Sequence, residues 1–171
     1  FHIGYKYAKL GYTAVFEPAV LPSNSRSAII EMSDIPMIDK GTYTVLSNDD
    51  FLLKLIQKKS NQKKINDYVA WIIQSTKSLG IKIVNPGGIN AFKFNQRELD
   101  LDEKNKKYNI TPRSILKILT KSLIDLKAPH PIHVHGCNLG VPGNVKTTLK
   151  QINAVEGKPM HLTHIQYHSY N

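Results

Sequence analysis

Short runs of apolar and β-branched residues alternate along this chain with longer segments in which apolar residues recur at helical spacing. The short runs predict strands at residues 13–16, 42–46, 81–84, 131–135 and 162–166. The longer segments predict helices at residues 4–10, 25–32, 49–57, 65–79, 111–126 and 144–155. Such alternation indicates an α/β fold with a parallel sheet, either doubly wound or part of a (β/α)₈ barrel. Five strands without a dinucleotide-binding fingerprint favour a partial TIM-like barrel.

Three predicted helices carry signals for their ends or their buried faces. Gly80 is expected to supply a left-handed stop for the first of them. Thr111 is the expected N-cap of the second, with Pro112 at its first helical position. The residues expected to face the core are Ile65, Tyr68, Val69, Ile72, Thr76 and Leu79 in the first, Ile115, Leu116, Leu119, Leu123 and Leu126 in the second, and Val145, Leu149 and Ile152 in the third.

The length and composition suit one domain or a substantial part of a larger one, with 171 residues of which 41% are apolar. Neither end has a polar fringe, so we expect residues 1–171 to be an internal fragment of one barrel without a second domain. Cys137 is the only cysteine, which excludes an intrachain disulfide. No apolar run is long enough for a membrane span and no signal peptide precedes the first strand, so we expect a soluble, cytoplasmic protein.

The net charge of +10 raises the alternative of a basic nucleic-acid-binding module. Only Arg26, Arg97 and Arg113 among the 23 basic residues are arginines, and the lysines are spread over the polar faces of predicted helices. They do not form one stripe with interleaved aromatic residues. A lysine-rich solvated surface explains this charge better, and we expect no nucleic-acid partner.

Six of the seven histidines lie in two short stretches, His130, His133 and His135, then His161, His164 and His168. Both stretches lie at the ends of predicted parallel strands, where barrels place their active sites. Two-residue spacing puts His133 and His135 on one face, with His135 nearer the rim, and His164 is the rim candidate on the last strand. Because neutral imidazole is the commonest metal ligand, His135 and His164 are predicted to bind metal. Any single histidine here could instead satisfy hydrogen bonds in a polar core.

Lys82 interrupts an apolar run on a strand that should be covered on both faces. Burial would lower the pKa of its amine, and a neutral amine can react with carbon dioxide to give a carbamate that bridges two metal ions. The alternative is a lysine whose charged end reaches solvent at the edge of the barrel. Cys137 has no base at a diagnostic spacing, and the glycine-rich turn at residues 85–88 lacks the Lys and Ser/Thr of a phosphate-binding loop.

Several linked motifs run through the chain: Ile83-Val84-Asn85-Pro86-Gly87-Gly88, His130-Pro131-Ile132-His133-Val134-His135, Asn138-Leu139-Gly140-Val141-Pro142-Gly143-Asn144 and His161-Leu162-Thr163-His164. The stretch Ser33-Asp34-Ile35-Pro36 with Ile38-Asp39-Lys40-Gly41 extends them toward the N-terminus. Together these motifs resemble the A-subunit family of formylmethanofuran dehydrogenase, in the metal-dependent amidohydrolase superfamily. The order Gly136-Cys137 departs from the pattern of that family.

The resemblance implies an amidohydrolase barrel in which a carboxylated lysine on the fourth strand and histidines on the fifth and sixth bind two zinc ions. Those roles map onto Lys82, His135 and His164, with Lys93 as a rival for the carbamate in a loop position. His133, Asn138 and Asn144 are second candidates, for orienting a ligand or contacting substrate. The family's His-x-His pair and late catalytic Asp are absent from this sequence. Residues 1–171 would therefore cover roughly the second to sixth strands and be inactive alone.

The resemblance also implies an activity. The family interconverts formate plus the amine of methanofuran with the formyl amide, and in methanogenic complexes a tungsten or molybdenum subunit supplies the formate. A different amidohydrolase, related to dihydroorotase or hydantoinase, would share the metals but not the loop motifs. A nucleic-acid-binding module would instead show steeply salt-dependent binding and no metal requirement.

Overall fold

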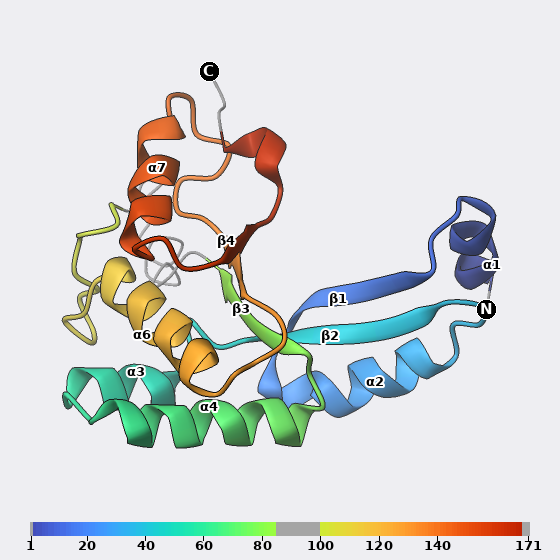
Figure 1. Ribbon diagram of the computed structural model, residues 1–171, viewed down its shortest axis with the longest axis horizontal. Coiled ribbons are helices and arrows are strands. Elements are labelled where there is room, and N and C mark those ends of the chain that lie inside the picture. The colour runs from blue at the N-terminus through green and yellow to red at the C-terminus, as the bar shows by residue number, and fades with distance from the viewer. Residues whose placement is uncertain (1, 85–99, 169–171) are drawn as a thin grey trace.

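A single parallel sheet organises the chain in the computed structural model, which describes residues 2–84 and 100–168 (Figure 1). The strands within those residues are β1 (Ala14–Val20), β2 (Asp39–Val45), β3 (Gly80–Val84), β4 (Ile132–His135) and β5 (Met160–Leu162). All neighbours are parallel, and the spatial order β1-β2-β3-β4-β5 follows the order in the chain. A doubly wound sheet reverses its strand order at a switch point, whereas a barrel does not. The prediction of an α/β fold is confirmed, and the topology is that of part of an α/β barrel.

Helices alternate with the strands along the chain. They are α1 (His2–Lys9), α2 (Ser25–Ser33), α3 (Asp50–Gln57), α4 (Gln62–Thr76), α6 (Pro112–Asp125) and α7 (Val145–Ala154), with short 3₁₀ helices η1 (Pro22–Asn24) and η2 (Ile165–Tyr167). Helix α1 comes before β1, and two helices, α3 and α4, lie between β2 and β3. The hydrophobic core lies between the sheet and the helices α3, α4 and α6, where fully buried Ile81 and Ile83 of β3 meet Val69 and Leu119. Since strand side chains alternate, the neighbours Lys82 and Val84 belong to the opposite face of β3.

Local sequence signals predict the start of α6 correctly but not the end of α4. The hydroxyl of Thr111 accepts from the backbone N–H of Ser114 at 3.2 Å, and Pro112 opens α6, as predicted. Gly80 as the stop of α4 is wrong. The left-handed residue is Lys77, with φ 55°, and Gly80 already belongs to β3.

The predicted inward face of α7 is also wrong. Val145, Leu149 and Ile152 are 39%, 54% and 40% exposed, whereas the polar residues Thr148 and Gln151 are buried. Hydrophobic patterning cannot predict this orientation, because the buried side is selected by hydrogen bonds to the segments that follow β4 and β5 and not by apolar contact.

Three strands differ in extent from their predictions, and one of them, β2, begins at Asp39 instead of residue 42. The first continues through Pro18 to Val20, and its register with β2 shifts between Glu17 and Val20. A proline is tolerated there because β1 pairs on one side only. The last strand was expected at residues 162–166 but ends at Leu162, and residues 165–167 form η2.

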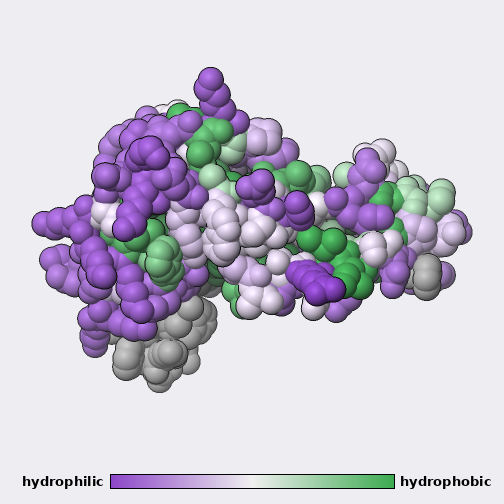
Figure 2. Space-filling view, turned by 90° about the horizontal axis from the view of Figure 1, so that it is seen from below, coloured by the Kyte–Doolittle hydropathy of each residue, from purple (hydrophilic) through white to green (hydrophobic). Residues whose placement is uncertain are grey.

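The face of the molecule seen from below separates into two regions (Figure 2). Hydrophilic residues dominate the side that α3 and α4 present, and hydrophobic residues gather toward α2, where Ile30 is 55% exposed (Figure 2). The outer parts of β1 and β2 extend away from the other strands and carry α1 at their far end (Figure 1). None of the helices in residues 2–84 and 100–168 has the length and hydropathy needed to cross a membrane.

Candidate functional site

Three polar residues form one row across the sheet, on the face opposite the helix-packed core. In the parallel register Lys82 of β3 pairs with His133 of β4, and His133 pairs with His161 of β5. His135 lies two residues farther along β4, paired with Val84, and therefore shares the face of His133. The sheet thus gathers one lysine and several imidazoles near the carboxyl ends of three adjacent strands.

The Lys82 side chain is buried rather than solvent-seeking, with only 2% of its surface exposed. Its Nζ lies 3.1 Å from Nδ1 of His133 and donates to Oγ1 of Thr163 at 3.2 Å. Burial lowers the pKa of this lysine from 10.5 to about 8. Of the two alternatives for Lys82, the structure supports the buried amine and excludes the lysine that extends to solvent.

His133 lies in an aromatic stack that sequence reasoning missed. Its ring is nearly parallel to that of Tyr43, with centroids 4.8 Å apart and planes at 19°, and the ring of His161 is 4.4 Å away. Tyr43 comes from β2, across Gly80, where a Cβ would lie 3.2 Å from the tyrosine ring. Burial, then the nearby Lys82 charge, lowers the pKa of His133 to about 3. Register across strands is the signal that would have found this stack.

The structure brings His135 and His164 together, as predicted. Their ring centroids are 5.3 Å apart, with the planes at 77°. His164 lies two residues beyond β5 in a left-handed conformation, with φ 56°, rather than on the strand itself. Burial, followed by the charges of His164 and Lys82, lowers the pKa of His135 to about 4, so its imidazole is neutral at pH 7.

Asn138 and Asn144 lie in the connection between β4 and α7. The amide of Asn144, a buried residue, donates to the backbone carbonyls of Asn138 and Tyr167. Asn138 itself adopts φ 55° at the turn. These contacts close the loop above β4, and a role for either amide toward substrate remains a prediction.

Cys137 and His168 are both buried, and the ring of His168 is also hydrogen-bonded. Burial raises the pKa of the Cys137 thiol to about 12, which makes it a poor nucleophile at neutral pH. His168, one of the six clustered histidines, has its Nε2 2.7 Å from the carbonyl oxygen of Thr163 and its Nδ1 3.1 Å from Oγ1 of Thr148. Because both ring nitrogens of His168 are engaged in these contacts, we assign it a structural role and not the role of a metal ligand.

The donor set is suited to a metal site only in part. Within the described part of the chain, no group of three His, Cys, Asp or Glu side chains is arranged to hold a metal ion. Two imidazoles, of His135 and His164, supply neutral nitrogen donors, and a carbamate on Lys82 would add oxygen donors. Lys93 and the turn at residues 85–88 lie outside the described residues.

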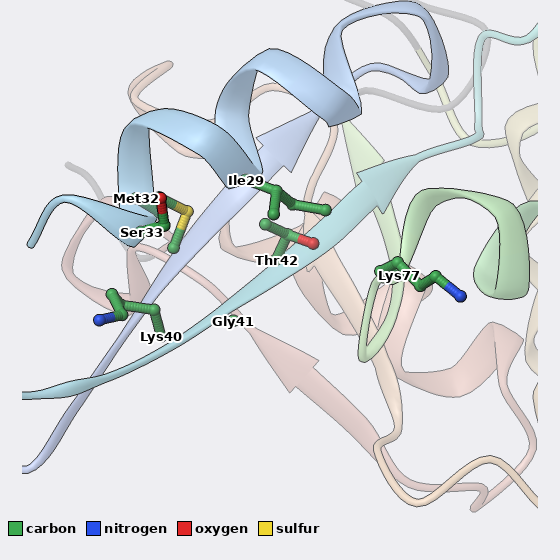
Figure 3. A pocket seen from close by; sticks show the side chains of 7 residues that line it. All are labelled: Ile29, Met32, Ser33, Lys40, Gly41, Thr42 and Lys77. Carbon is green, nitrogen blue, oxygen red and sulfur yellow. The ribbon is translucent and has the colours of Figure 1, made fainter.

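A separate hollow of about 230 Å³ lies between α2 and β2, among Ile29, Met32, Ser33, Lys40, Gly41, Thr42 and Lys77 (Figure 3). Thr42 is adjacent to Tyr43 in β2 and therefore faces the other side of the sheet from the histidine row. Lys40 donates to the carbonyl of Ile35 at 2.6 Å and does not extend into the hollow. The candidate site and this hollow share no residue.

Comparisons with known proteins agree with the motifs. No family model matches the chain. It is 38% identical over 168 residues to the A protein of the formyltransferase/hydrolase complex Fhc of Methylorubrum extorquens, and 38% identical over 178 residues to Protein FwdA of Methanocaldococcus jannaschii. Each match covers 98% of this chain but only 31% of the relative.

A solved structure gives the same result. The crystal structure of the formyltransferase/hydrolase complex FhcABCD of Methylorubrum extorquens with methylofuran contains a chain that matches at a TM-score of 0.94 and 37% identity. This match covers 98% of the present chain and 31% of that chain. The resemblance predicted from the motifs is thereby confirmed: this chain is homologous, along nearly its whole length, to one section of the A-subunit family that includes FwdA and its Fhc counterpart.

Proposed function

We propose that these residues are a section of the catalytic barrel of a protein of the A-subunit family, and that Lys82, His135 and His164 contribute to its dinuclear metal site of the amidohydrolase type. One observation carries the proposal: Lys82 is buried beside His133 without an acidic partner among residues 2–84 and 100–168. An isolated buried ammonium is costly, so a fold that retains one there needs a reason. Conversion to a carbamate supplies that reason.

The chemistry of carbamate formation fits the environment of Lys82. The neutral amine adds to carbon dioxide, forming one N–C bond while one C=O π bond opens to a carboxylate oxygen, and the nitrogen releases one proton. Counted from the ammonium ion, two protons leave in total, and a buried cation becomes an anion. With a pKa of about 8, about a tenth of the lysine is already neutral near pH 7, far more than for an unperturbed lysine. The imidazoles of His135 and His164 approach each other from adjacent strand ends, and both belong to the same rim of the sheet.

These three residues would hold two divalent cations, which we propose to be zinc, together with ligands from elsewhere in the full-length protein. When bound, such ions supply Lewis acidity that polarises an amide carbonyl and makes water a better nucleophile. The protein's part is to present oxygen and nitrogen donors near the carboxyl ends of the strands, with Lys82 buried, His135 half-buried and His164 exposed in the turn after β5. The His-x-His pair and the acid/base Asp implied by the resemblance would come from outside residues 1–171.

For the reaction, we propose interconversion of a formyl amide with formate and the free amine of a methanofuran-type carrier. The support is that the structurally matched complex is described with methylofuran and contains four kinds of subunit. Other subunits are therefore the expected partners, and in a reductive complex one of them would carry tungsten or molybdenum and supply formate. A dihydroorotase-like or hydantoinase-like amidohydrolase is the alternative, and hydrolysis of a cyclic amide by the full-length protein would identify it.

The test compares wild-type full-length protein with Lys82→Ala and Lys93→Ala. Metal content, the ¹³C NMR signal of a carbamate after exchange with ¹³C-bicarbonate, and release of formate from an N-formyl furfurylamine are measured for each. We expect Lys82→Ala to lose the carbamate, about two metals per chain and formate release, and exposed Lys64→Ala to change none of them. Losses with Lys93→Ala alone would move the carbamate to Lys93. If neither change altered metal or activity, the site would have no catalytic role.

A further inference from the structure

The hydroxyl of Thr163 occupies a fixed orientation next to Lys82. Its Oγ1 donates to the carbonyl oxygen of Val134 at 3.0 Å, so its hydrogen is committed to β4. It can therefore only accept from Nζ of Lys82, at 3.2 Å, in a buried contact. His133, the other neighbour of Nζ, can accept or donate through Nδ1 according to its tautomer.

This difference becomes important once Lys82 is carbamylated. A carbamate nitrogen keeps a single N–H, so it can donate one hydrogen bond where the amine donated two. Thr163 offers an acceptor that cannot change its role. Because a carbamate is planar, an acceptor that fixes the direction of the N–H also fixes the plane that contains the two carbamate oxygens.

The backbone at Thr163 is anchored from two sides. Its N–H donates to the Val134 carbonyl at 3.0 Å, and its own carbonyl accepts from Nε2 of His168 at 2.7 Å. His168 is 2% exposed, and its Nδ1 contacts Oγ1 of Thr148 in α7. The turn that leads into His164 is therefore tied to α7 by buried hydrogen bonds.

The end of β4 is anchored to the same helix. Gln151 of α7 is fully buried, and its Oε1 accepts from the backbone N–H of Cys137 at 3.2 Å, two residues after His135. Gly136 makes room for it, since a Cβ there would lie 2.8 Å from that oxygen. The polar face of α7 thus holds both strand ends that carry the candidate histidine ligands.

We propose that Thr163 is a positioning residue that orients the carbamate of Lys82, and that His168 and Thr148 hold Thr163 in place. The inference rests on the proposed function and adds a residue that the donor set does not include. Its role is exerted through Lys82, not by contact with metal or substrate.

The decisive variant is Thr163→Val in the full-length protein, which keeps the shape but removes the accepting oxygen. We expect the zinc dissociation constant to rise about tenfold and the ¹³C-carbamate signal at a fixed bicarbonate concentration to fall, with Thr163→Ser restoring both. Thr44→Val is the matched control. It removes a buried threonine hydroxyl that bonds Thr76 at 3.0 Å on the other face of β2, and it should leave zinc affinity and carbamate unchanged.

The outcomes separate the two proposals. Wild-type zinc affinity and carbamate signal in Thr163→Val would overturn the positioning role while leaving the proposed function intact. Equal losses in Thr44→Val would also overturn it, because they would trace the effect to general destabilisation. Absence of carbamate and zinc from the wild-type protein would instead refute the proposed function. If Thr163→Val does not accumulate, Thr163→Ala against Thr163→Ser repeats the comparison.

Discussion

Replacing Lys82 by methionine should stabilise the metal-free protein while abolishing its metal site. Burial lowers the pKa of Lys82 from 10.5 to about 8, a difference that corresponds to about 3 kcal/mol. The unfolded chain binds the proton more tightly than the folded one, so this penalty is complete below about pH 8. It shrinks between pH 8 and 10.5, and it is absent at higher pH. Methionine has similar length and no charge, and it removes the penalty.

Part of that gain is lost with the lysine's hydrogen bonds. The contacts of Nζ to His133 and Thr163 contribute about 1 kcal/mol together, so we expect a net stabilisation of about 2 kcal/mol at pH 7. Since local opening governs amide exchange, backbone amides of β3 and β4 should exchange about thirtyfold more slowly in Lys82→Met. At pH 9 the advantage should fall about tenfold, because the unfolded state is still protonated while the folded state no longer is.

The assay is hydrogen–deuterium exchange with mass spectrometry on peptides from residues 80–84 and 132–135, in full-length protein freed of metal and bicarbonate. Lys64→Met, at an exposed position of α4, is the control and should leave both peptides unchanged. The reasoning is refuted if Lys82→Met exchanges as fast as wild type, or faster, at pH 7. An advantage that persists undiminished at pH 9 would show that better packing, not a removed charge, is responsible.

Three further predictions concern a buried thiol, a close approach and a helix cap. Cys137 should react with iodoacetamide at pH 8 at least about a hundredfold more slowly than a free cysteine, because a pKa of about 12 leaves very little reactive thiolate at that pH. Rapid alkylation of the folded protein would contradict this. Gly136→Ala should destabilise the β4 end by about 2 kcal/mol, because the new Cβ displaces Gln151; exchange of the β4 peptide would measure this, and unchanged exchange would contradict it. Thr111→Ala should cost about 1 kcal/mol through loss of the α6 N-cap, seen as faster exchange in the first turn, whereas Thr111→Ser should restore it.

The fold class was predictable because its causes are local. Apolar runs of strand length alternating with amphipathic segments appear in the sequence whatever the rest of the molecule does, and each strand found in the structure overlaps a predicted one. The N-cap at Thr111 followed from a single side chain and its neighbours. The prediction for α7 failed because the buried Thr148 and Gln151 are explained only by their partners His168 and Cys137, which lie in the segments after β5 and β4.

The sequence by itself determined which residues carry the chemistry: the lysine inside an apolar strand and the histidines at two strand ends. Only the tertiary structure decided how they meet. The parallel register sets Lys82 beside His133, and the turn after β5 brings His164 to His135. The two-residue alternation of side chains along a strand determines which face of the sheet a residue occupies, but not which residue of the next strand lies beside it. Neighbours depend on how strands far apart in the chain align, which requires backbone hydrogen bonds between them.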